Sequence, residues 1–145
     1  MAASSSQKDI LLPRPTSPLI RVSCFFRKDP SISQAEFDTY WRDTHGTLVV
    51  ASKIYRDTRI QGYTQVHNAR ELTKEAAKMG LSVLDFEWDA CSEMYFHSWE
   101  DYRQFAASDE MRDVLGPDGA RMMGPDKTVR AIVALVDPVS REQAL

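Results

Sequence analysis

The chain has 145 residues, of which 43% are hydrophobic and 27% charged, a balance typical of one soluble globular domain with one core. The net charge of -3, with no cluster of Lys and Arg, argues against a nucleic-acid partner, because phosphate binding needs a basic surface. The apolar runs are far shorter than the roughly 20 residues of a membrane helix, so we expect a cytoplasmic protein with no membrane partner.

The two ends of the sequence differ in composition from its centre. Residues 1–17 are rich in Ser and Pro and predict a flexible N-terminal arm. A single domain is expected over 18–137, followed by a tail at 138–145. Within the domain, the β-rich run LIRVSCFF at 19–26 predicts the first strand. The only cysteines, one here and one at position 91, lie in apolar runs and are expected to be free, buried thiols.

The first helix has a clear start and an uncertain middle. Ser33 and Glu36 form a capping-box pattern, which predicts that a helix begins after Ser33. Aromatic residues at helical spacing follow, but Gly46 predicts a kink or a break. The run RIQGYTQVH at 59–67 then predicts the second strand.

The second half of the sequence predicts two helices and two strands. A short polar helix or mobile excursion is expected over 69–80, ended by its glycine. The run at 85–96 predicts the third strand, and Ser98 is expected to cap the helix after it. The three glycines and two prolines of 116–126 predict a loop, and the apolar run at 128–136 predicts the fourth strand.

The order of these elements predicts a ferredoxin-like βαββαβ fold of the α+β class, in which a four-stranded antiparallel sheet carries helices on one face. The fourth strand is apolar on both faces: Val129 and Val133 point one way, Ile132 and Val136 the other. Because the face without helices also needs a cover, a second copy of the same sheet is the simplest solution, and we expect a homodimer.

Several motifs together carry a resemblance to a known family. The helix sequence F-x-x-Y-W-x-x-T-H-G at 37–46 is followed by the strand G-Y-T-Q-V-H at 62–67 and by SWEDYRQF at 98–105. This pattern, over roughly 19–136, resembles the EthD-type branch of the dimeric α+β barrel superfamily. The resemblance implies two ferredoxin-like subunits with sheets packed face to face, and a small-molecule cavity between the sheet and the helices of each subunit.

Within that branch, the chain is most similar to fungal polyketide decarboxylases of the atrochrysone carboxylic acid type. The resemblance therefore implies a role in fungal secondary metabolism, with an aromatic polyketide carboxylic acid as the substrate. Related barrels include cofactor-free anthrone oxygenases, polyketide cyclases and muconolactone isomerase-like proteins. Fold alone does not choose among these activities. A cyclase or dehydratase, and an aromatic-ligand-binding barrel without turnover, therefore remain alternatives.

Two histidines are candidates for chemistry. His45 before Gly46 is typical of a helix C-terminal cap, but in the resembling family the His-Gly pair lies at the cavity. His67 shares one face of the second strand with Tyr63 and Gln65, because alternate residues of a strand point the same way. These three side chains form either a satisfied polar ladder at a strand end or a row of hydrogen-bonding groups directed at a ligand.

These residues support a hypothesis for decarboxylation. His45 and His67 would act as the acid/base pair, because the pKa of histidine lies near working pH. Tyr63 or Gln65 would donate a hydrogen bond to the developing oxyanion, and both would orient the substrate. No cofactor is expected, because a β-carbonyl is itself an electron sink, and no metal-binding spacing is present. The expected substrate walls are aromatic: Phe26, Tyr40, Trp41 and Trp88. Whether 69–84 forms a lid is left open.

Overall fold

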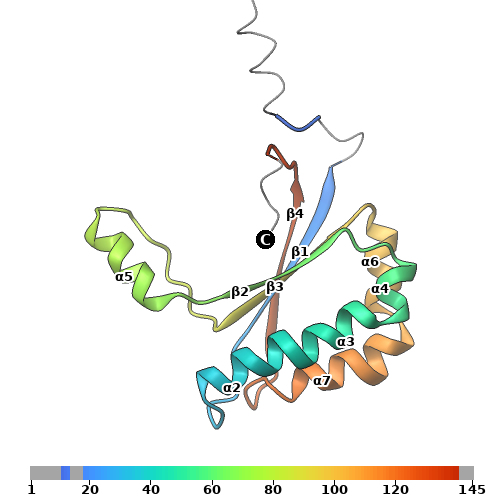
Figure 1. The fold of residues 1–145 in the computed structure, drawn as a ribbon, viewed down its shortest axis with the longest axis horizontal. Helices are drawn as coiled ribbons and strands as arrows, with labels where there is room; N and C mark the ends of the chain where they lie inside the picture. Colours follow the sequence, from blue (N-terminus) through green and yellow to red (C-terminus); the bar gives the residue numbers. More distant parts are fainter. Residues whose placement is uncertain (1–10, 14–17, 141–145) are drawn as a thin grey trace, which may run out of the picture.

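The computed structural model describes residues 11–13 and 18–140, so most of the predicted N-terminal arm (1–17) and the last five residues of the predicted tail (138–145) lie outside the described residues. Its centre is a four-stranded antiparallel sheet in the order β2-β3-β1-β4. The strands are β1 (Leu19–Phe26), β2 (Gly62–His67), β3 (Ala90–Phe96) and β4 (Val129–Val136). The predicted ferredoxin-like α+β fold is confirmed (Figure 1).

Of the kink or break predicted at Gly46, the break is absent, and a π-helical turn precedes the glycine instead. One composite helix runs without interruption from residue 34 to 51. It consists of α2 (Gln34–Thr39), the π-helical turn η1 (Tyr40–His45) and α3 (Gly46–Ala51). The predicted capping box at Ser33 and Glu36 is present at its start. The helix ends instead at Ser52, whose extended backbone (ψ 147°) directs the chain into the short helix α4 (Lys53–Asp57).

The segment 116–126, predicted as a loop, is helical in its first half. The predicted Ser98 cap begins α6 (Trp99–Ala106), and a second composite helix follows over 109–120. It contains the π-helical turn η2 (Met111–Leu115) and α7 (Gly116–Ala120). Pro117 lies inside this composite helix, directly after η2, where the backbone N–H of Gly116 donates to the carbonyl of Met111 five residues earlier. The wider turn accommodates a residue that has no N–H of its own. The glycines and proline of this segment therefore permit a helix where they were expected to prevent one.

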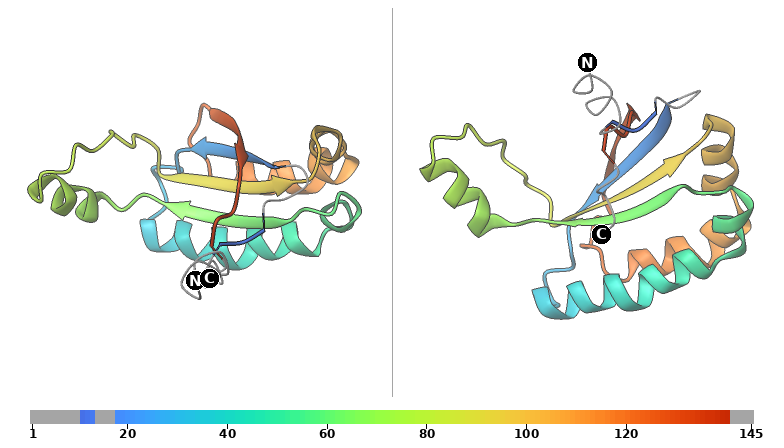
Figure 2. Two further views of the ribbon diagram at one scale, coloured as in Figure 1. Left: turned by 90° about the horizontal axis from the view of Figure 1, so that it is seen from above. Right: turned by 45° about the horizontal axis from the view of Figure 1, so that its top comes forward.

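The remaining boundaries shift by a few residues. The second strand begins at Gly62 rather than at 59, and the third at Ala90 rather than at 85. Residues 68–89 between them leave the body of the molecule and carry the predicted polar helix, α5 (Arg70–Lys78). Gly80 follows α5 with a φ of 91°, a left-handed conformation that glycine adopts readily. The views from different sides agree that α5 stands clear of the other helices and strands (Figures 1 and 2).

The helices of the described residues cover one face of the sheet, as predicted (Figure 1). Both composite helices pass below the sheet (Figure 1), where Val22 and Phe96 of the strands pack against Phe105 and Leu115 of the helices. We call the opposite side, to which Phe25, Glu93 and Thr64 point, the open face. In residues 11–13 and 18–140, no helix is long and apolar enough to cross a membrane.

Candidate functional site

A cavity of about 300 Å³ lies between the sheet and the two composite helices. Its walls are mostly apolar, and four methionines contribute to them: Met94, Met111, Met122 and Met123. Among the described residues, no Lys, Arg, Asp or Glu side chain lines this cavity. Such a space suits a flat apolar ligand and gives a bound carboxylate no direct cationic partner, apart from a protonated histidine.

The histidine in this wall is His45, and a π-helical turn presents it. The wider turn lets the backbone N–H of Gly46 donate to the carbonyl of Trp41, five residues earlier. The same carbonyl accepts a second hydrogen bond from Nε2 of Gln65 on β2, at 2.8 Å. A Cβ at Gly46 would lie 3.3 Å from this carbonyl oxygen and 3.4 Å from Nε2 of Gln65. Glycine therefore allows the helix and the strand to approach closely.

Asp118 of α7 holds the His45 ring. Its Oδ2 lies 2.8 Å from Nδ1 of His45, while its Oδ1 accepts a hydrogen bond from the Tyr40 hydroxyl at 2.5 Å. The exposed fractions of the two side chains are small, 14% for His45 and 9% for Asp118. Since the ionised carboxylate can only accept, Nδ1 of His45 donates to it, and Nε2 is the ring nitrogen left for a ligand. Of the two positions considered for His45, a helix cap and a cavity wall, the structure shows the second, because His45 lies inside a helix and lines the cavity.

The electrostatics favour a charged carboxylate at position 118. Burial acts to raise the pKa of the Asp118 carboxyl, but hydrogen bonds from Tyr40 and His45 oppose it and leave the pKa below its ordinary value. The same hydrogen bond to Asp118, with burial, raises the pKa of the Tyr40 hydroxyl. Gly119 leaves room beside this group, since a Cβ there would lie 3.3 Å from Cε1 of His45.

Three other predicted site residues lie around the same cavity as His45. Phe26 and Trp41 form part of its wall, with ring centroids 5.3 Å apart in an edge-to-face arrangement. Tyr63 also lines it, and burial raises the pKa of its hydroxyl. The Tyr63 oxygen accepts a hydrogen bond from Nε2 of Gln65 at 2.9 Å, which leaves its own O–H free to donate toward a ligand.

His67 and Gln65 lie on a different cavity. They line an open groove of about 520 Å³ between β2 and the first composite helix. His67 is exposed, contacts Oδ1 of Asp38 at 3.0 Å and packs against the Trp41 ring, with centroids 4.8 Å apart. The structure therefore does not bring His45 and His67 to one cavity, although Tyr63 borders both.

The last two predicted wall residues point elsewhere. Tyr40 does not line the cavity and reaches Asp118 instead. Trp88 packs beside Phe25 of the open face, with ring centroids 6.4 Å apart, and Arg27 lies over its ring at 4.2 Å. In the described part of the chain, no group of three His, Cys, Asp or Glu side chains is placed to hold a metal ion. Both cysteines are free: Cys91 is buried and Cys24 half-buried, in the cavity wall.

Sequence reasoning missed Asp118. It lies 73 residues from His45, in the segment that the glycines and prolines had marked as a loop. No spacing rule connects two residues from the two halves of the chain. The D-G pair in GPDGA is a local signal, but it is more typical of a turn.

Comparisons with known proteins agree with this architecture. Residues 29–126 match the EthD domain family. A solved EthD (ethyl tert-butyl ether D) family protein from Bacillus halodurans C-125 is similar in fold, with a TM-score of 0.53 and 15% identity over 80% of this chain and 96% of that chain. A search among curated proteins gave no match.

Two further solved structures have the same fold. One is a dimeric ferredoxin-like protein of unknown function from Bacteroides fragilis NCTC 9343, with a TM-score of 0.53 and 11% identity over 81% of this chain and 96% of that chain. The other is a dimeric ferredoxin-like protein of unknown function from Thermobifida fusca YX, with a TM-score of 0.52 and 12% identity over 83% of this chain and 93% of that chain.

Proposed function

Because the chain belongs to the EthD domain family, we propose that it is a cofactor-independent decarboxylase of an aromatic polyketide carboxylic acid. The observation that carries the proposal is a single histidine, held by a buried carboxylate, in the wall of a mostly apolar cavity. That arrangement supplies a proton donor where a carbanion equivalent would form. The chemistry requires no further group, since a carbonyl β to the carboxylate accepts the electrons.

The proposed reaction begins with the substrate carboxylate in the apolar cavity. With no Lys or Arg in the wall, this carboxylate is poorly stabilised, so loss of carbon dioxide, which moves the charge elsewhere, is favoured. The bond between the carboxyl carbon and the ring carbon breaks, and its electron pair forms an enolate with the neighbouring carbonyl. The Tyr63 hydroxyl donates a hydrogen bond to the enolate oxygen.

His45 completes the reaction. The imidazolium transfers the proton on Nε2 to the carbon that has lost the carboxyl group, and water later returns a proton to the neutral ring. Asp118 and Tyr40 are positioning residues in this scheme, because neither lines the cavity. Asp118 fixes the ring orientation through Nδ1 and stabilises the imidazolium, while Tyr40 holds the second carboxylate oxygen.

The test is incubation of the pure protein with an anthraquinone-precursor carboxylic acid, under air and under nitrogen. Equal release of carbon dioxide in both gases is expected. Product that forms only in air would instead indicate a cofactor-free anthrone oxygenase, and a ring-closed or dehydrated product without carbon dioxide a cyclase or dehydratase. Binding of the acid without any product would indicate an aromatic-ligand-binding barrel.

The chain has three histidines, so each can be replaced in turn and its contribution to kcat measured separately. We expect His45→Ala to lower kcat by roughly 100- to 10,000-fold, the usual contribution of a general acid. His97→Ala is the matched control at an exposed position. The predicted catalytic role of His67 requires that His67→Ala also lowers kcat, whereas its place in the second groove favours a small effect.

We also propose a homodimer that covers the open face. The large apolar side chains of β4 are exposed on both faces: Val129 45%, Ile132 52%, Val133 53% and Leu135 69%. By the pairing register, Val129, Val133 and Leu135 lie on the helix-covered side of the sheet and Ile132 lies on the open face. A second sheet on the open face would therefore bury Ile132. The ferredoxin-like proteins from Bacteroides fragilis and Thermobifida fusca are dimeric, which supports the proposal of a homodimer.

A further inference from the structure

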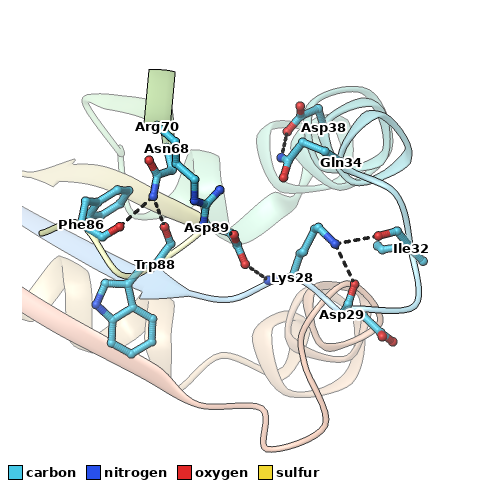
Figure 3. Close-up of polar contacts among 10 residues, drawn as sticks. All are labelled: Lys28, Asp29, Ile32, Gln34, Asp38, Asn68, Arg70, Phe86, Trp88 and Asp89. Atoms are coloured by element: carbon cyan, nitrogen blue, oxygen red, sulfur yellow. Dashed lines mark hydrogen bonds and ion pairs between the residues drawn. The ribbon is translucent and has the colours of Figure 1, made fainter. Parts of the chain in front are cut away.

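The segment 68–89, which we call the arm, is firmly attached to the sheet at its root. The Asn68 side chain donates from Nδ2 to the carbonyls of Phe86 and Trp88, at 2.7 Å each, and so joins the two limbs of the arm (Figure 3). The backbone N–H of Asn68 also donates to the carbonyl of Asp89, at 3.1 Å. The arm therefore leaves the sheet as a closed loop with fixed ends.

The Asp89 carboxylate ties this root to the end of β1. One oxygen accepts from the backbone N–H of Lys28 at 2.9 Å and the other from Arg70 at 2.8 Å, so the two limbs of the arm and the end of β1 meet at one group (Figure 3). The backbone N–H of Asp89 donates to the carbonyl of Phe26. Charge-assisted hydrogen bonds of this kind hold a direction as well as a position.

The tip of the arm exposes apolar side chains that nothing in the described chain covers. The exposed fractions are 70% for Leu72, 87% for Met79, 64% for Leu81 and 90% for Leu84. The polar side of α5 carries the exposed pairs Glu71–Lys74 and Glu75–Lys78, so the helix is amphipathic with its apolar side in solvent. A fixed arm with an uncovered apolar side is typical of an interaction surface.

The direction of the arm identifies its partner. Phe86 and Trp88 of the returning limb pack on Phe25, with centroids 5.9 Å and 6.4 Å away, so this limb leaves along the open face. That is the face proposed for the dimer. Within one chain, the arm joins β2 to β3 at one edge of the sheet, while β4, whose Ile132 is 52% exposed on the open face, forms the opposite edge. Two copies can therefore cover the apolar side of the arm and the exposed strand β4 together, if the arm of each chain lies on β4 of the other.

We propose that the arm docks on a second copy of this chain, with the apolar side of α5 and Leu84 against the partner's fourth strand, and reciprocally in the other copy. This inference rests on the proposed homodimer. A two-fold axis makes the exchange mutual, so each contact occurs twice and the assembly closes. The charged side of α5 then stays in water, as its ion pairs require.

Sedimentation equilibrium of the full chain over a range of concentrations tests the arm separately from the dimer. The variant Leu72→Glu with Leu84→Glu places charge on the apolar side. The control Lys74→Gln with Ser82→Glu makes the same change in formal charge at exposed positions on the arm. We expect the double Leu variant to raise the dimer dissociation constant at least tenfold, and the control to leave it within twofold of the wild type.

The outcomes are distinct. A wild-type dimer whose dissociation constant is unchanged by the Leu variant would overturn the arm contact while the dimer stands. A monomeric wild type at all concentrations would overturn both. An unchanged dimer together with weaker binding of the aromatic acid would mean that the arm covers a ligand cavity, and this also overturns the proposal. Circular dichroism checks that each variant keeps its fold.

Discussion

Asp118→Asn is the substitution that most directly tests how the site is built. Asparagine has the shape of aspartate but carries no charge, and one of its two terminal atoms is a donor. The carboxylate accepts one hydrogen bond on each oxygen, from the Tyr40 hydroxyl and from Nδ1–H of His45. The asparagine side chain has a single, uncharged acceptor oxygen and can keep only one of the two. The side chain lies at 9% exposure, so water cannot replace the lost interaction without local opening.

The size of the effect follows from the bond that is lost. A hydrogen bond to a charged group contributes about 1.5–3 kcal/mol. Since about 1.4 kcal/mol corresponds to a tenfold change in rate, kcat should fall by roughly 10- to 150-fold. KM should stay within about twofold, because Asp118 does not line the cavity and makes no contact with a bound substrate in the proposed mechanism.

The assay is the initial rate of carbon dioxide release over a range of substrate concentrations, with thermal unfolding measured on the same samples. Asp113→Asn is the matched control, since Asp113 lies on the same composite helix but is exposed and paired with Arg112. A folded Asp118→Asn protein with wild-type kcat would refute the role of the carboxylate. A large rise in KM with unchanged kcat would place Asp118 in substrate binding instead.

Three further predictions concern the close approaches and the charge at the site. Gly46→Ala should lower the free energy of unfolding by about 1 kcal/mol in urea melts, because crowding against the Trp41 carbonyl outweighs the better helix propensity of alanine; a gain in stability would contradict the tight π-helical turn. Gly119→Ala should lower kcat for carbon dioxide release on the order of tenfold by displacing the His45 ring, and an unchanged rate would show that the ring tolerates the shift. The pKa of Asp118 is lower in the folded protein, so its contribution to stability is present above about pH 4 and is lost as the pH falls through the folded-state pKa. The gap in unfolding free energy between the wild type and Asp118→Asn should therefore be smaller at pH 3 than at pH 6, and a gap independent of pH would argue against this lowered pKa.

The features that sequence analysis predicted well are those set by local chemistry. The first strand begins and ends where its apolar alternation does, at Leu19 and Phe26. The capping residues Ser33 and Ser98 accept the hydrogen bonds expected of them. Gly80 ends α5 with a positive φ. Each of these depends on a few neighbouring residues, so no knowledge of the tertiary structure was needed.

The site could be predicted only in part, for the opposite reason. His45, Tyr63, Phe26 and Trp41 were expected at a cavity and line it. The partner of His45 was not found, because a contact over 73 residues depends on how two helices pass each other below the sheet. Trp88 was predicted inside the third strand, but that strand begins only at Ala90. The alternation of the strand therefore does not extend to Trp88, whose ring packs beside Phe25 on the open face.

The two halves of the fold position the site residues through the same local feature, a π-helical turn followed by glycine. In each half, the composite helix contains a π-helical turn that is followed at once by glycine, Gly46 in one and Gly116 in the other. A Cβ at these glycines would lie 3.3 Å and 2.7 Å from a backbone carbonyl oxygen five residues earlier. The sequence therefore did contain a signal, a glycine within each helix whose lack of a side chain permits the wider turn. A π-helical turn is rare and needs tertiary support, which the Gln65 hydrogen bond supplies in the first half. The first π-helical turn presents His45, and the second is followed by Asp118. The pair that carries the proposed chemistry therefore depends on two similar π-helical turns, one in each half of the chain, rather than on one contiguous motif.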